Sequence, residues 1–175
     1  MRISVAEAAR VLEERGVLKR LRNDQSERVI PFVREVLGRD LPADLEDFYR
    51  AHIATIDGNP ALVPVWSEWG GWRDWGETIK RLLDANAVPL VLEGCGNLFG
   101  LDLSPGESNP AVYLFDHETH FDRPEYAAGS SLGAFLLLLA DEDRAYDEGW
   151  PEGWQLTIDP DLNLCPRARA VWTYT

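Results

Sequence analysis

The segment "FDHETHFD", residues 115–122, gathers side chains that could bind a metal ion or transfer protons. If residues 116–120 were extended, Asp116, Glu118 and His120 would share one face and offer oxygen and nitrogen ligands. His117 would then point away, and the spacing is not the HExxH pattern that brings two imidazoles together on a helix. The structural alternative, which we favour, is that Asp116 and His117 end a strand and bond to nearby backbone.

The stretch "PLVLEGCGNLFGLDLS", residues 89–104, is similar to the start of a nucleotide-binding site, because glycines at 94, 96 and 100 follow an apolar run. A dinucleotide loop needs a helix after its glycines, whose N–H groups hold the pyrophosphate. Residues 98–103 alternate like a strand instead, and the Lys-Ser/Thr pair of a P-loop is missing. The sequence therefore predicts a strand, a tight turn and a second strand, with Gly94, Gly96 and Asn97 suited to positive φ.

Single residues elsewhere give weaker indications of catalysis. Cys95 has no cation beside it in the sequence that would stabilise a thiolate. His52 follows a predicted helix, where a structural role is sufficient. Ser130 and Ser131 precede another predicted helix, where capping explains them. We therefore predict no catalytic residue, no metal and no other cofactor.

The chain is strongly acidic, with 17 lysines and arginines against 30 aspartates and glutamates and a net charge of −13. Such a surface disfavours nucleic acids and anionic membranes, because affinity for phosphate groups depends on Lys and Arg. It favours a basic protein partner, mainly by accelerating encounter, although solubility alone is the simpler explanation. Two cysteines indicate reduced thiols, and the run "AFLLLLA" is too short for a membrane span, so we expect a cytoplasmic protein.

Capping residues and hydrophobic spacing predict the elements around these motifs. Ser4 and Ser26 cap two helices, and Ser130 or Ser131 caps the last one. The N-terminal segment resembles the opening of a helix-turn-helix, but no second basic helix follows, which argues against DNA binding. Further helices are predicted over 41–54 and 74–84, and strands in 56–66 and over 88–93, 97–104, 110–119 and 153–158.

Tryptophans recur at positions 66, 69, 72 and 75, around a Gly70-Gly71 pair that argues against one unbroken helix. Their rings either cap one end of the core or form a semi-exposed patch that binds a partner, since Trp is enriched among interface hot spots. The acidic run 140–154 places carboxylates beside Trp150 and Trp154, a combination that suits a basic protein surface.

Four motifs follow one another in an order that resembles the SUKH superfamily of fungal cell-wall-assembly regulators and bacterial immunity proteins. They are "LPADLEDFYRAH", "VPLVLEGCGNLFGLDLS", "VYLFDHE" and "SSLGAFLLLL", within about residues 26 to 140. The resemblance implies a single α+β domain with a central, mainly antiparallel sheet flanked by helices, and a binding module without enzymatic activity. We expect an N-terminal helical extension over 1–25, the SUKH-like domain over 26–150, and a C-terminal extension over 151–175 packed on the same domain.

The resemblance and the charge together predict an immunity protein that neutralises a basic, nuclease-like toxin by occluding its active site. The alternatives are a regulatory scaffold of the cell-wall-assembly type and a metal-dependent enzyme that uses residues 116–122. The sequence leaves the identity of the partner and the oligomeric state open. The predicted partner-binding residues are Trp69, Trp72, Glu93, Asp102, Asp116, Glu118, Asp141 and Glu142.

Overall fold

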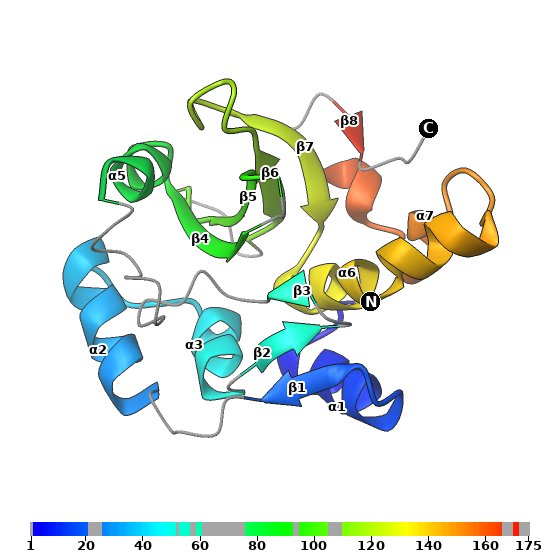
Figure 1. Cartoon of the computed structure of the whole chain (residues 1–175). Coiled ribbons are helices and arrows are strands. Elements are labelled where there is room, and N and C mark those ends of the chain that lie inside the picture. The colour runs from blue at the N-terminus through cyan, green and yellow to red at the C-terminus, as the bar shows by residue number, and fades with distance from the viewer. Residues whose placement is uncertain are drawn as a thin grey trace.

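The computed structural model describes residues 2–20, 26–51, 53–56, 59–60, 76–92, 95–104, 110–165 and 170–171 (Figure 1). The helices are α1 (Val5–Glu14), α2 (Ser26–Leu37), α3 (Ala43–Arg50), α5 (Gly76–Asp84), α6 (Leu132–Glu148), α7 (Gln155–Ile158) and the 3-10 helix η1 (Leu162–Leu164). The strands are β1 (Leu18–Arg20), β2 (Ile53–Ile56), β3 (Asn59–Pro60), β4 (Ala87–Leu92), β5 (Leu98–Asp102), β6 (Val112–Phe115), β7 (Pro124–Gly129) and β8 (Ala170–Val171).

The larger sheet has the strand order β4-β5-β6-β7-β8. Its first four strands pair antiparallel, and β8 pairs parallel to β7. Strands β4, β5 and β6 are buried along almost their whole length, as their apolar sequences indicate. With helices packed around this sheet, the chain has the predicted α+β fold with a central, mainly antiparallel sheet (Figure 1).

Helix α6 lies between the larger sheet and the N-terminal part of the chain (Figure 1). It begins as predicted at Ser131, whose Oγ accepts a hydrogen bond from the Ala134 N–H at 3.2 Å. Leu132, Phe135 and Leu136 are fully buried, because the first half of the helix is apolar on every side and has neighbours on both faces. Within the described ranges, every helix is too short or too polar to span a bilayer.

The N-terminal segment is part of the same core. Ser4 caps α1 as predicted, and Val5, Ala8 and Leu12 are fully buried. A Cβ atom on Gly133 of α6 would lie 2.3 Å from the Ile3 carbonyl oxygen, so only glycine allows the two segments to approach this closely. Strand β1, which was not predicted, then pairs with β2 in a small sheet of order β1-β2-β3.

Two predictions about strands fail. Residues 155–158 form the short helix α7 instead of a strand, and the preceding Trp154 packs edge-on against Trp150 with ring centres 5.2 Å apart. Strand β7 was missed because "PEYAAG" begins with proline and lacks an apolar–polar alternation. The secondary structure of both segments depends on packing against residues that are distant in sequence. A prediction from short sequence windows does not include that packing.

Candidate functional site

The glycine turn, residues 95–97, reverses the chain between β4 and β5. The two strands pair antiparallel, with Leu92 opposite Leu98. Gly96 has a φ of 101°, which side chains rarely allow. Strand β5 begins at Leu98, so no helix follows the glycines. The predicted strand–turn–strand arrangement is confirmed, and the segment lacks the helix N-terminus that a dinucleotide loop requires.

Residues 116–122, which follow β6, form a second turn, and the extended conformation considered for residues 116–120 is wrong. The Asp116 carboxylate accepts a hydrogen bond from the Glu118 N–H at 2.7 Å, and the Asp116 carbonyl accepts from the Phe121 N–H at 3.0 Å. His120 and Phe121 have φ values of 59° and 60°. Asp116 thus bonds to local backbone, as the structural interpretation predicts. The common face of Asp116, Glu118 and His120 is not formed.

These two turns lie side by side and are joined by Asn97 and His117. The Asn97 side-chain oxygen accepts a hydrogen bond from the His117 backbone N–H at 3.1 Å and lies 2.9 Å from His117 Nδ1. The register of the sheet explains the approach. Leu98 of β5 pairs with Phe115 of β6, so Asn97, which precedes Leu98, lies beside the turn that follows Phe115. We call residues 95–97 and 116–122 together the paired turns.

Charged side chains surround the paired turns. Glu118 is exposed, and its carboxylate has no partner among the residues that the structure describes. Asp122 lies 3.7 Å from Arg81 of α5, which also donates to the His120 carbonyl at 3.4 Å. In the described ranges no three His, Cys, Asp or Glu side chains are arranged to hold a metal ion. The arrangement is therefore suited to polar and ionic contacts with another molecule.

The remaining predicted partner-binding residues do not join Asp116 and Glu118. Asp102 is only 2% exposed, and its carboxylate accepts from the Ser104 N–H at 2.9 Å, where it ends β5. Asp141 and Glu142 are 5% and 8% exposed in α6. Such burial leaves little of these three carboxylates for a partner to contact, so we do not count them in the candidate binding surface. Trp69, Trp72 and Glu93 lie outside the described residues.

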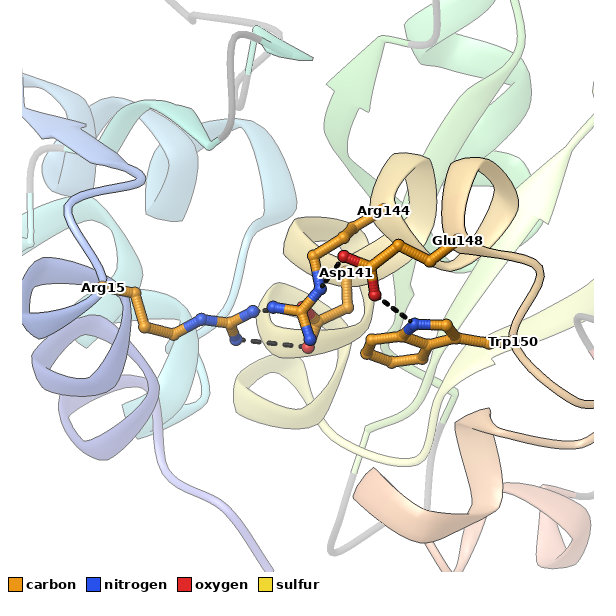
Figure 2. Close-up of polar contacts among 5 residues, drawn as sticks. All are labelled: Arg15, Asp141, Arg144, Glu148 and Trp150. Atoms are coloured by element: carbon orange, nitrogen blue, oxygen red, sulfur yellow. Dashed lines mark hydrogen bonds and ion pairs between the residues drawn. The ribbon is translucent and has the colours of Figure 1, made fainter.

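Contacts within the protein occupy several residues of the acidic run 140–154. Asp141 forms an ion pair with Arg15, the residue that follows α1, and Arg144 lies 3.7 Å from the same carboxylate (Figure 2). The Arg144 guanidinium also lies 4.6 Å from the centre of the Trp150 ring. The Trp150 indole N–H donates to Glu148 at 2.8 Å. Trp150 therefore serves internal packing, and Trp154 is buried.

A motif typical of serine hydrolases was not predicted. Residues 129–133, "GSSLG", have the Gly-x-Ser-x-Gly spacing of a nucleophile elbow and lie between β7 and α6. Ser131 nevertheless has an extended φ of −151° and is 1% exposed. Its hydroxyl donates to the Ile3 carbonyl at 3.2 Å and accepts from the Ala134 N–H. The serine therefore caps a helix and is not presented to a substrate.

The Asn97–His117 contact was also missed, because the two residues are 20 positions apart. The contact follows from the β5–β6 register, which the sequence does not give.

The family model described as SMI1 / KNR4 family (SUKH-1) matches residues 26–138. Neither the comparison with curated proteins nor that with solved structures gives a match. The matched region begins with α2, contains both paired turns, and ends within α6.

Proposed function

Because the chain belongs to the SMI1/KNR4 family (SUKH-1), which includes immunity proteins and regulators of the Smi1/Knr4 type, we propose that it is a non-enzymatic protein-binding module that acts in immunity. Its partner in this proposal is a basic, nuclease-like toxin. The chain covers the toxin's active site and excludes the anionic substrate. Neither catalysis nor a cofactor of the chain itself is required.

The net charge of −13 carries this proposal. A nuclease presents a cationic surface to its nucleic acid substrate, and an acidic protein of complementary shape competes for that surface. Long-range attraction mainly accelerates association, whereas a small number of buried contacts sets the lifetime of the complex. An interface of about 1,600 Å² would be sufficient for a stable complex of this kind.

The paired turns are the part of the described surface that best fits a basic partner. Glu118 is exposed and its carboxylate makes no interaction within the described chain, so a partner's cation can approach it without breaking an existing contact. Asp122 is exposed and only distantly paired with Arg81. His120 and Phe121 hold a backbone conformation that non-glycine residues rarely adopt, a feature that clusters at functional sites.

Affinity capture from the native host tests this function. The tagged chain is used as bait beside two charge-reversal variants, and captured proteins are identified by mass spectrometry. Glu118→Lys alters the paired turns. Glu35→Lys is the matched control, because Glu35 is exposed on α2, which lies apart from the β6–β7 loop in Figure 1. We expect a basic protein that is captured by the wild type and the control and is depleted with Glu118→Lys.

Inhibition of the captured protein completes the test. If that protein degrades nucleic acid, one equivalent of the chain should abolish its activity. A captured protein without toxic activity would favour the second candidate, a regulatory scaffold, which the family's own description in terms of SMI1 and KNR4 supports. Equal capture by wild type and Glu118→Lys would place the binding surface away from the paired turns and contradict that part of the proposal.

A further inference from the structure

The orientation of the Asn97 amide follows from its backbone contact. The His117 backbone N–H lies 3.1 Å from the Asn97 side-chain oxygen. A backbone N–H can only donate, so the atom that faces it must be an acceptor. This requires the amide oxygen, and not the amide nitrogen, to point toward His117. The amide oxygen and nitrogen have nearly the same shape, so hydrogen bonding is what distinguishes the two orientations of the Asn97 amide.

The same oxygen determines the protonation of the imidazole. His117 Nδ1 lies 2.9 Å from Asn97 Oδ1, which is hydrogen-bond distance. Because the oxygen is an acceptor, Nδ1 must carry the hydrogen. The Asp116 carboxylate, 3.6 Å from Nδ1, places negative charge on the same side of the ring. In the neutral imidazole the lone pair then resides on Nε2, the opposite nitrogen.

That opposite nitrogen is available to another molecule. The His117 side chain is 45% exposed, and Nε2 has no hydrogen-bond partner among the described residues. The ring lies against the glycine turn, since a Cβ on Gly96 would be 3.7 Å from its Cγ and Nδ1. Contacts on one edge therefore fix the ring, while the other edge offers an acceptor in a defined direction. Such fixed groups lose little conformational entropy when they bind.

We propose that His117 is a partner-binding residue whose Nε2 accepts a hydrogen bond from a lysine or arginine of a basic protein. This inference deepens the proposed function and depends on it for the identity of the partner. A lone pair attracts a cationic donor and repels a carboxylate or phosphate. The negative charges of the neighbouring Asp116 and Glu118 also favour a cation over an anion. Asn97 acts through His117 and is a positioning residue.

The first test needs no partner. Nitrogen-15 NMR of the His117 ring in the full chain distinguishes Nδ1–H from Nε2–H. We expect the Nδ1–H form in the wild type. In Asn97→Ala, which removes the acceptor, we expect a shift toward Nε2–H, the usual tautomer of a free imidazole. A wild-type ring in the Nε2–H form overturns the inference whatever protein the chain binds.

The second test uses a hexa-arginine peptide as the cationic probe, with dissociation constants measured by calorimetry. His117→Asn retains a donor near the Nδ1 position and removes Nε2, so it isolates the proposed acceptor. We expect about fivefold weaker binding for this variant at pH 7.5, the effect of one hydrogen bond, and no change for the exposed control Glu35→Gln.

Two results would contradict the acceptor role. One is equal affinity of wild type and His117→Asn for the peptide, and the other is no measurable binding of the peptide. Either result would leave capture of a basic protein from the host unaffected. Failure of capture, conversely, would reject the proposed function without changing the tautomer seen by NMR.

Discussion

Arg15 at the end of α1 and Asp141 in α6 form a two-pronged ion pair between segments 126 residues apart in sequence. One of its hydrogen bonds joins Nη1 to Oδ2 at 3.2 Å (Figure 2). Neither residue lies within the region that the family model matches. The pair fastens the N-terminal helix to the second half of α6, and it neutralises a carboxylate that is almost fully buried.

Removing Arg15 should destabilise the protein. Arg15→Ala leaves the Asp141 carboxylate buried, with Arg144 as its remaining cationic neighbour among the described residues. We expect a loss of about 2 kcal/mol in the free energy of unfolding, which is less than the full buried-pair value because Arg15 is partly exposed. Urea denaturation measures this change. Arg10→Ala is the control, because its pair with Glu14 is exposed and should contribute less than about 0.5 kcal/mol. Equal effects of both substitutions would contradict the role given to Asp141.

Adding a methyl group at Gly133 should separate the N-terminal segment from α6. The new Cβ of Gly133→Ala would lie 2.3 Å from the Ile3 carbonyl oxygen, so the backbone must move. We expect a loss of about 2 kcal/mol or more in unfolding free energy, typical of an overpacked core. Gly76→Ala has no atom within 4 Å and provides the control, with little change or a small gain. Unchanged stability of Gly133→Ala would mean that the close approach is absent in solution.

Glu46 of α3 should make stability depend on pH. Burial by itself would raise the pKa of Glu46, but hydrogen bonds from Arg34 and Arg50 outweigh this and hold the pKa below its ordinary value of 4.5. The ionised form therefore stabilises the fold above about pH 4.5, and this stability is lost as the pH falls through the folded-state pKa.

Glu46→Gln should consequently lower the unfolding free energy at pH 7 by about 1 kcal/mol and have little effect near pH 3. Denaturation at both pH values gives the comparison. Glu35→Gln on α2 serves as the exposed control. A deficit of Glu46→Gln that is as large at pH 3 as at pH 7 would show that packing, and not charge, accounts for the contribution of this residue.

Charge reversal at the paired turns should act on association with the captured partner. Glu118→Lys replaces an exposed carboxylate by a cation and should reduce the association rate constant several-fold at low salt. Glu35→Lys makes the same change of charge on α2 and should have a smaller effect, because only long-range attraction is altered. Rapid-mixing kinetics distinguish the two variants, and identical rate constants would exclude the paired turns as the contact surface.

The sequence predicts those parts of the fold that depend on local chemistry. Ser4 and Ser131 cap helices where their side chains can accept from free N–H groups, and Gly96 provides the φ that the β4–β5 turn requires. By contrast, α7 and β7 depend on packing against distant elements. The local composition of "QLTI" and "PEYAAG" therefore gives the wrong structure or none.

Three of the predicted partner-binding residues are buried in the structure, and the reason is physical. Acidic residues are usually exposed, so Asp102, Asp141 and Glu142 were natural choices for a partner surface. Inside the protein, Arg15 stabilises Asp141, and the Ser104 N–H stabilises Asp102. The pairing of Arg15 with Asp141 cannot be predicted from the sequence without the topology. Asp116 and Glu118 lie at the surface turn because the strand before them ends there.

The salt dependence of association tests the central claim most directly, namely that an acidic binding module captures a basic protein by electrostatic attraction. The association rate constant for the partner captured from the host is measured between about 0.05 and 0.5 M salt, over which range charge interactions are progressively screened. We expect the rate constant to fall by about tenfold or more, with a weaker dependence for Glu118→Lys. A rate constant that does not change with salt would contradict the proposed mechanism.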